Sequence, residues 1–482
     1  MIDKYKLKKG CAIAIAVYIA FAISFFFICG EQLHYQDNTT DMLSPFSTVG
    51  EITSDTVIEQ QLKPEGDIFT GVTLMGATYN RANTGRLVVE IFDGEQPLGS
   101  TSVDISDIVD NTKFHVPLAF PLPDTARLTL RITAPESVPG NAVTLYYGNS
   151  RSAARAQVKA ELSEDEHLLV NGEPVEGALC ISMGTRTKLL LGVYYWYIAI
   201  AVLVAAALYC VFLIRRNANG KSSGLLKLIT AFSRYRFLIK QLVARDFKTK
   251  YKRSVLGVLW SFLNPLLTMT VQYVVFSTLF RSDIPNFALY LLSGIVCFSF
   301  FSESTSMALS SIVGNAALIT KVYVPKYIYP LTRVMSSVIN FLLSLIPLFA
   351  VVLLTRTPIR VSFLLLPIGV VCLFVFSLGV GLILASSMVF FRDTQFLWGI
   401  MTMLWMYATP VFYPESILPA KLMPLFKCNP LYHIIRFIRV VLMDGVSPEP
   451  KAYVLMLAAS LLPLAIGIWI FKKTQDKFVL NI

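Results

Sequence analysis

The sequence is poor in charge and in metal-binding side chains, and this argues against several classes of protein. Only 15% of the 482 residues are charged, against about 25% in an ordinary soluble domain, and 55% are hydrophobic. Disorder, a coiled coil and a purely soluble enzyme are therefore disfavoured. The four histidines form no cluster and the seven cysteines include no CxxC pair, so the sequence predicts neither a metal site nor a disulfide framework.

A loop that holds nucleotide phosphates is also missing. Gly220-Lys221-Ser222 matches the end of a P-loop, but the pattern requires glycine where the chain has Arg215, and a strand where it has an apolar run. No nucleophile lies beside a base on a recognisable scaffold. We therefore expect no catalytic residue, no ATP site and no other cofactor in this chain.

Long apolar runs predict eight membrane spans, because each has the length and composition that a bilayer requires. The predicted spans are 11–29, 193–214, 255–280, 287–312, 328–354, 361–390, 395–413 and 452–471. Residues 1–30 are interpreted as a cytoplasmic tail and an uncleaved anchor, since the apolar run is longer than a signal-peptide core and no A-x-A-like site follows it. The predicted fold class is a polytopic α-helical membrane protein.

The distribution of charge predicts how the chain is oriented. Between residues 215 and 254 there are 12 Lys/Arg and one acid, Asp246, a net charge of +11. Such a patch can bind nucleic acid. A basic block between two apolar spans instead favours contact with the cytoplasmic membrane surface, so residues 217–254 are interpreted as a basic cytoplasmic interfacial segment. The segment 191–216 contains the second span. Aromatic residues lie at the start of this span and Arg215-Arg216 follow its end, so it should run from the outside to the inside. We expect a bacterial cytoplasmic-membrane protein with both termini in the cytoplasm and no nucleic-acid partner.

Residues 31–190 have a different character, with 11 Lys/Arg against 22 acids and no spanning run. Alternation with period two in 86–92 and 127–133 predicts half-buried strands, and Asp93-Gly94 predicts a tight turn. Further strand candidates are 69–79, 98–103 and 142–148. About seven such strands predict an extracytoplasmic all-β sandwich, jelly-roll-like, inserted between the first two spans.

One carboxylate and several aromatic rings lie at or near span interiors. Glu303 must contact protein, water or a substrate path, because a bare carboxylate in hydrocarbon costs a few kcal/mol or more. A structural hydrogen bond to Ser302, Ser306 or a neighbouring helix would also satisfy it. The rings either face lipid or stack on sugars in a translocation path. The candidates for such a path are Trp260, Phe298, Phe300, Phe301, Glu303, Trp405 and Tyr407.

A third group of polar residues precedes the last span. His433, Arg436 and Arg439 recur every three residues, which predicts that they lie along one helix face. There they would contact lipid headgroups, or a pyrophosphate or anionic glycan that suits the planar guanidinium.

Four segments carry a resemblance to a known family. They are RDFKTKYKRSVLGVLWSFLNPLL (245–267), GNAALITKVYVPKYIYPL (314–331), FFRDTQFLWGI (390–400) and the stretch from TPVFYPESIL to CNPLYHIIRFIRVVLMDG (409–445). In this order they resemble type-2 ABC exporter permeases, which export O-antigen, teichoic acid and related lipid-linked glycans. The resemblance covers about 225–482, and the first 220 residues are not part of the common family pattern.

The resemblance implies a division of labour. Residues 255–482 would form a six-span permease domain, two copies would form one channel, and two separate ATPase subunits would supply ATP and magnesium. The segment 314–331 would couple to the ATPase through Asn315, Leu318, Ile319, Lys321, Val322, Pro325 and Lys326, with a short helix from Ala316 to Lys321 that stops before Pro325. The interfacial helix before the first permease span would include Arg245, Asp246, Lys248, Tyr251, Lys252 and Arg253. The stretch with His433, Arg436 and Arg439 would be an external re-entrant region.

The predicted function is export of a lipid-linked cell-surface polysaccharide or teichoic-acid-like polymer, in contact with membrane lipids. Two alternatives stay open from the residues alone. One is an ABC exporter of a drug or a small lipid. The other is a membrane glycosyltransferase or ligase with a sugar-binding ectodomain, which would require an acidic site that the spans scarcely offer beyond Glu303 and Asp393.

Overall fold

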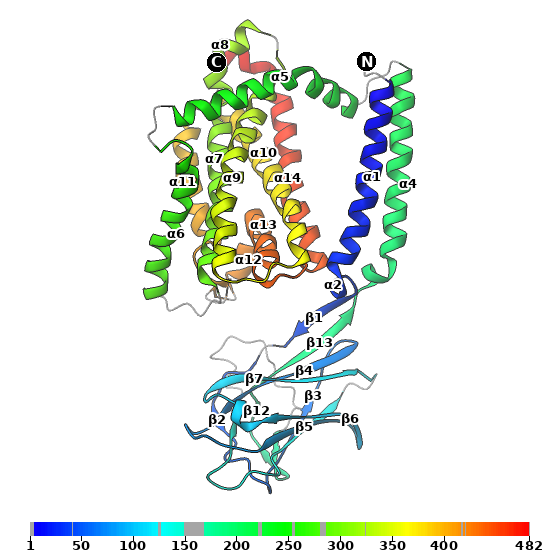
Figure 1. The fold of residues 1–482 in the computed structure, drawn as a ribbon, viewed down its shortest axis with the longest axis vertical. Helices are drawn as coiled ribbons and strands as arrows, with labels where there is room; N and C mark the ends of the chain where they lie inside the picture. The colour runs from blue at the N-terminus through cyan, green and yellow to red at the C-terminus, as the bar shows by residue number, and fades with distance from the viewer. Residues whose placement is uncertain are drawn as a thin grey trace. The chain divides into compact units, whose positions relative to one another are not determined.

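The computed structural model describes residues 4–40, 42–123, 127–148, 168–219, 224–252, 256–279, 286–322, 324–415, 418–419 and 421–481. The chain divides into two compact units, Leu33–Tyr195 and the combination of Met1–Gln32 with Trp196–Ile482. The first unit is built of strands and the second of helices (Figure 1). The predicted combination of a polytopic helical protein with a β domain is confirmed.

Seven helical segments in the described part of the chain are long and apolar enough to cross a membrane. Their helices are α1 (Lys4–Cys29), α4 (Leu190–Ala218), α6 (Leu259–Leu279), α7 (Phe287–Leu309), α9 (Ile328–Leu354), α10 (Leu366–Phe390) and α14 (Pro450–Thr474). They correspond to all predicted spans except 395–413.

Shorter helices connect and cover these spans. They are α2 (Glu31–His34), α5 (Gly224–Tyr251), η2 (Val313–Asn315), α8 (Ala316–Lys321), η3 (Val361–Leu365), α11 (Thr394–Tyr407), α12 (Met423–Lys427), α13 (Pro430–Arg439), the π-helix η5 (Val440–Asp444), η6 (Gln475–Lys477) and α15 (Phe478–Asn481).

The core of the helical unit lies around α7. Of the apolar stretch of α7, 72% is buried within the chain, against 11% for α4 and α6 and 6% for α1. Buried side chains of α7, α9, α10 and α13 form one continuous cluster, which Phe301 and Phe376 join by stacking with their ring centroids 5.1 Å apart. Most of the apolar surface of α1, α4 and α6 is therefore exposed on the outside of the bundle.

The predicted span 395–413 differs from the structure. Only its first part is helical, as the 14-residue α11, which at 1.5 Å per residue is about 21 Å long and shorter than the ~30 Å hydrocarbon layer. Pro410 follows closely, and proline disfavours helix at the residue before it. The irregular chain continues beside α7, because Tyr290 donates its hydroxyl to the carbonyls of Pro410 and Tyr413. The prediction of one continuous span over 395–413 is therefore wrong, because it was based on hydrophobicity and ignored the proline.

The β unit consists of two antiparallel sheets. One has the order β1-β13-β4-β9-β12 with β2 and β7 attached, and the other β11-β10-β3-β8-β5-β6. The strands are β1 (Tyr35–Thr39), β2 (Ser47–Thr48), β3 (Val57–Leu62), β4 (Ile68–Ala77), β5 (Arg86–Asp93), β6 (Gln96–Asp104), β7 (Thr112–Pro121), β8 (Leu128–Thr133), β9 (Thr144–Gly148), β10 (Leu168–Val170), β11 (Glu173–Val175), β12 (Ala178–Leu179) and β13 (Ile181–Lys188). A short 3-10 helix, η1 (Ile105–Asp107), follows β6.

Both sheets contribute to a single hydrophobic core. In β8 the buried positions alternate strictly at Leu128, Leu130 and Ile132, as the period-two pattern predicted. The predicted turn at Asp93-Gly94 joins β5 to β6, with Asp93 paired to Gln96 and Gly94 at a φ of 61° that glycine adopts without strain. The expected number of about seven strands was too low. The strands β2, β10, β11 and β12 are too short to show alternation, and β1, β3, β7 and β13 were not among the candidates. The jelly-roll connection stays a prediction.

We predict that the β unit folds without the helices, because it has its own closed core. A fragment of residues 31–190 should be soluble and unfold cooperatively in urea. Ile132→Asp, at a fully buried core position, should lower its free energy of unfolding by more than about 3 kcal/mol. Val109→Asp, at a valine that is 64% exposed, is the control and should leave it nearly unchanged. Aggregation of the wild-type fragment, or a gradual transition, would contradict the prediction.

Candidate coupling and translocation site

The helix α5 organises one end of the bundle. Its 28 residues lie within the basic block predicted at 217–254. Ile239, Leu242 and Asp246 are buried at spacings of three and four, so they share one face, while Lys240 and Lys248 are exposed. Lys252 is exposed just after the helix. The side chain of Tyr251 and all of Arg253, also predicted for this segment, lie outside the described residues.

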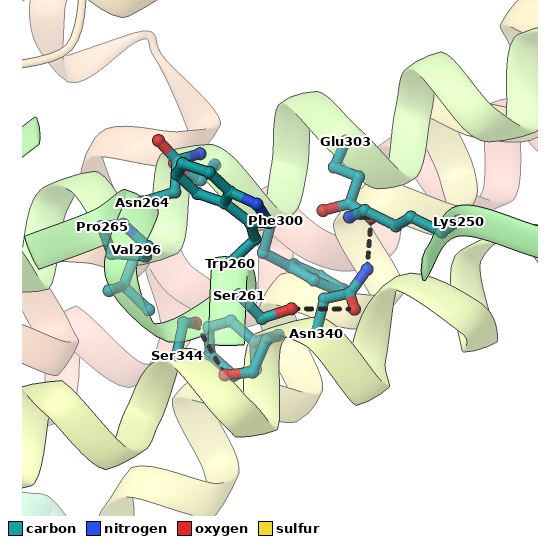
Figure 2. Close-up of a pocket in the computed structure, with 12 residues that line it drawn as sticks. Lys250, Trp260, Ser261, Asn264, Pro265, Val296, Phe300, Glu303, Asn340 and Ser344 are labelled. Carbon is teal, nitrogen blue, oxygen red and sulfur yellow. Dashed lines mark hydrogen bonds and ion pairs between the residues drawn. The ribbon is translucent and has the colours of Figure 1, made fainter. Parts of the chain in front are cut away.

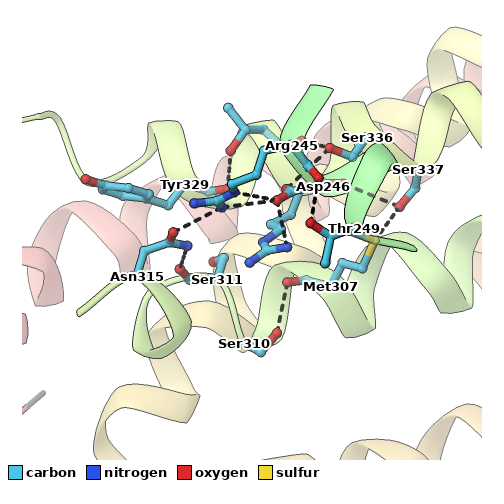
Figure 3. Close-up of polar contacts among 12 residues, drawn as sticks. Arg245, Asp246, Thr249, Met307, Ser310, Ser311, Asn315, Tyr329, Ser336 and Ser337 are labelled. Carbon is cyan, nitrogen blue, oxygen red and sulfur yellow. Dashed lines mark hydrogen bonds and ion pairs between the residues drawn. The ribbon is translucent and has the colours of Figure 1, made fainter. Parts of the chain in front are cut away.

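Asp246 is the buried hub of a polar network on α5 (Figure 3). Its side chain is 4% exposed, and its Oδ1 lies 3.1 Å from Nη2 of Arg245 and 3.2 Å from Nη1 of Arg333 on α9. The hydroxyl of Ser336, also on α9, donates to its other oxygen at 3.5 Å. Sequence reasoning assigned Asp246 to the membrane surface. Its position as the one acid among 12 basic residues was the signal that it needs a specific partner.

The same network reaches the predicted coupling segment. Arg245 donates from Nη2 to Oδ1 of Asn315 at 3.3 Å, and Asn315 donates from Nδ2 to the carbonyl of Ser311 at 2.7 Å. Asn315 is the residue before α8, so α5, α8 and α9 are held together at one point. Figure 3 shows Asn315 and Arg245 pointing toward each other.

The helix α8 spans Ala316–Lys321, the same residues as the predicted short helix, and Val322 after it is extended. Leu318 and Ile319 are half-buried against the chain's own core, so they offer a partner less surface than predicted. Lys321 and Val322 are exposed, Val322 by 49%.

The C-terminal end of the coupling segment also contacts the rest of the chain. Pro325 is half-buried, and Lys326 donates to the carbonyl of Gln475 at 2.5 Å. Lys326 is thus held by the C-terminal tail, although the resemblance implied that it contacts the ATPase. The outward surface of this loop is centred on Lys321 and Val322.

A polar cavity of about 420 Å³ opens among α5, α6, α7 and α9 (Figure 2). Oε1 of Glu303 lies 2.8 Å from Nζ of Lys250 and accepts a hydrogen bond from Nδ2 of Asn340 at 2.6 Å. Glu303 is therefore satisfied by a neighbouring helix, one of the predicted options, and by a lysine that sequence reasoning missed. The pair is partly open to water, with side chains 30% and 42% exposed. Trp260 and Phe300 also line this cavity.

A second cavity, of about 480 Å³, begins at the same pair. Lys250 and Glu303 line both cavities, and the second one extends past Arg245, Asp246 and Arg333 to Gly314 beside the coupling segment. The two cavities therefore adjoin at this ion pair.

The other predicted path residues lie elsewhere. Phe298 is 6% exposed and Phe301 fully buried, so both are core residues in this conformation. Trp405 packs against Phe301 with ring centroids 5.2 Å apart and donates its Nε1 hydrogen to Asn429. Tyr407 is 58% exposed on α11. Of the seven path candidates, only Trp260, Phe300 and Glu303 line the polar cavity.

The predicted single face of His433, Arg436 and Arg439 is wrong. Steps of three residues turn by about 300° on a helix, so two steps displace the third residue by roughly a third of a turn. Arg436 is exposed and lies 3.8 Å from the carboxylate of Glu415, and Nε2 of His433 lies 2.7 Å from the carbonyl of Lys427.

Arg439 points the other way, into the core of the bundle. It donates to the carbonyls of Pro410, Val411 and Tyr290, and its guanidinium lies 3.5 Å from the centre of the Tyr290 ring. It thus fixes the irregular chain after α11 to the start of α7. For Arg439 the predicted contact with headgroups or glycan is replaced by a structural role.

We predict that Asp246 is needed for stability. Asp246→Asn keeps the shape but leaves two arginines facing a neutral amide, so it should lower the free energy of unfolding by about 2–3 kcal/mol. This is less than the ~3–5 kcal/mol for breaking a fully buried pair, because Arg245 is half-exposed. Thermal unfolding in mild detergent measures this. Asp393→Asn, at an exposed carboxylate, is the control. Equal melting temperatures for the two variants would show that the network is dispensable.

Comparison with known proteins identifies the helical unit. Residues 237–443 match the family described as ABC-2 type transporter. The chain is 31% identical to the O-antigen export system permease protein RfbA of Klebsiella pneumoniae over 242 residues, which is 50% of this chain and 93% of that protein. It is also 31% identical to RfbA of Myxococcus xanthus over 262 residues, 54% of this chain and all of that protein.

A more distant relative is the polysialic acid transport protein KpsM of Escherichia coli, 21% identical over 250 residues, 51% of this chain and 97% of that protein. These relatives are transporter subunits rather than enzymes, which argues against the glycosyltransferase alternative. The chain belongs to the ABC-2 type transporter family of multi-pass inner-membrane permeases.

Proposed function

We propose that this chain is the membrane subunit of an exporter for a lipid-linked cell-surface polysaccharide. The observation that carries the proposal is its match along 93–100% of the length of permeases named for O-antigen export. The polar spaces on both sides of Lys250 and Glu303 support it, because a glycan needs a wet, hydrogen-bonding surface inside an apolar bundle. A teichoic-acid-like polymer has the same requirement.

ATP-binding cassette subunits power permeases of this family, and we infer that two of them bind a homodimer of this chain and carry the ATP and magnesium. The contact on this chain is the α8 loop, whose outward residues are Lys321 and Val322. Val322 offers a half-exposed apolar side chain with the exposed charge of Lys321 beside it, so the two form a small mixed surface for the ATPase.

In this proposal the Lys250–Glu303 pair closes the path between substrates. Nucleotide-driven movement of α8 would act on α5 and α9 through Asn315, Arg245 and Asp246. The pair would then part, and Trp260 and Phe300 would offer ring faces to passing sugars. The β unit would lie outside the membrane and hold the emerging glycan or contact a protein of the cell envelope.

The functional proposal predicts a coupling defect for Val322→Asp. The variant should insert and fold normally, because the side chain is half-exposed, but it should lose partner-stimulated transport and bind the ATPase about 1–3 kcal/mol more weakly. Surface glycan in cells and co-purification of the ATPase are the two measurements. Ile359→Asp, at an isoleucine 61% exposed between α9 and α10, is the control and should retain both. Full export by Val322→Asp would remove the loop from the mechanism, and normal surface glycan in a strain lacking this chain would remove the function.

Orientation gives a separate prediction. Leu7, Leu213 and Leu226 pack together, so the N-terminal lysines, Arg215-Arg216 and the start of α5 share one side of the bundle, the side expected to be cytoplasmic. Single cysteines at Ser100, Lys240 and Thr320, all exposed, can be tested in a cysteine-free background. An impermeant maleimide on intact cells should label only position 100. Labelling at 240 or 320 would reverse the topology.

A further inference from the structure

A large apolar groove lies apart from the two polar cavities and shares no residue with them. It has a volume of about 1000 Å³ and is bounded by α5, the start of α9, α10 and α14. Buried side chains such as Ile239, Leu382 and Phe471 form part of its lining, and they belong to the hydrophobic cluster that also supports α8. Nothing in the coupling or translocation roles described above uses this groove.

The groove has the depth and the polarity of one bilayer leaflet. Its lining on the C-terminal side runs from Leu464 through Ile468 and Lys472 to Gln475, a helical spacing that keeps these residues on one face. The eleven steps from Leu464 to Gln475, at 1.5 Å each, span about 16 Å, roughly half of the ~30 Å hydrocarbon layer. The deep end is entirely aliphatic at Leu464 and Leu378, and the polar residues are confined to the other end.

Two cations from different helices line the polar end of the groove. Arg236 on α5 and Lys472 on α14 both line the groove and are both exposed. Neither forms an ion pair with an acid among the described residues, and Asp476, though next to Gln475 in the chain, does not line the groove. Positive charge above an aliphatic slot is complementary to a phosphate that carries acyl chains.

We propose that this groove binds an anionic glycerophospholipid, with its acyl chains along Leu464, Ile468 and Leu382 and its phosphate between Arg236 and Lys472. Basic pockets between membrane helices hold anionic headgroups in this way. Because α5 and α14 each supply one cation, the lipid bridges the interfacial helix to the last span. The inference requires only that the bundle lies in a membrane, so it stands or falls separately from the exported polymer.

Native mass spectrometry of the full-length chain in mild detergent, titrated with phosphatidylglycerol, tests the headgroup. We expect one tightly bound lipid per chain, and much weaker binding of phosphatidylcholine. Combined Arg236→Ala and Lys472→Ala should weaken phosphatidylglycerol binding about thirtyfold. The control is Lys473→Ala, which removes a neighbouring cation that lies over the Trp469 ring and does not line the groove. Equal affinity in the double variant and the control would overturn the proposal.

A second pair of variants tests the slot while leaving the charges in place. Ile468→Trp should fill the groove and abolish the bound lipid, whereas Ile466→Trp on the same helix should not. The two isoleucines are matched, being 51% and 50% exposed, and only Ile468 lines the groove. Retained binding in Ile468→Trp would reduce the effect to nonspecific attraction at the surface. Displacement of phosphatidylglycerol by equimolar polyprenyl diphosphate would reassign the groove to a substrate lipid and overturn the proposal.

Discussion

The helical unit depends on one constraint: a charge that enters an apolar bundle must find a partner there. Isolated charges in such surroundings cost several kcal/mol, so each one fixes the geometry of the groups around it. Asp246 on α5 pairs with Arg333 on α9. Glu303 binds both Lys250 and Asn340. Arg439 donates hydrogen bonds to three backbone carbonyls. These three sites add specific polar contacts to helices whose shared core is otherwise mostly apolar.

The same constraint acts differently on a charge held by main-chain atoms and on a pair of side chains at a cavity. Arg439 is almost fully buried and its carbonyl partners are main-chain atoms that cannot leave, so its role is to hold the chain after α11. Lys250 and Glu303 are partly hydrated and border two cavities. Water competes for the ions of a partly exposed pair, so this pair contributes less to stability than the buried Asp246 network does. The closure proposed above requires a pair of this kind, because it separates more readily than a buried one.

The sequence predicted what depends on local pattern and missed what depends on distant partners. Hydrophobic runs gave the seven long helices, alternation gave β5 and β8, and Pro325 gave the end of α8. The inward turn of Arg439 was missed because a three-residue spacing was taken as one face. The partners of Asp246 and Glu303 lie 87 and 53 residues away, at Arg333 and Lys250, and no periodicity links them.

The spacing of these polar residues suggests how the two sites act together. Asp246 and Lys250 are four residues apart on α5, and Ser336 and Asn340 are four apart on α9. Each pair therefore lies one turn apart on its helix. The Asp246 network and the Glu303 pair are two polar contacts, one helical turn apart, that connect α5 to α9. Glu303 itself belongs to α7 and takes part in the second contact. In the proposed export cycle, a shift of α8 that moves Arg245 would tilt α5 at the Asp246 network. This tilt would lengthen the contacts of Glu303 with Lys250 and Asn340. The coupling segment would then control the closure without touching it.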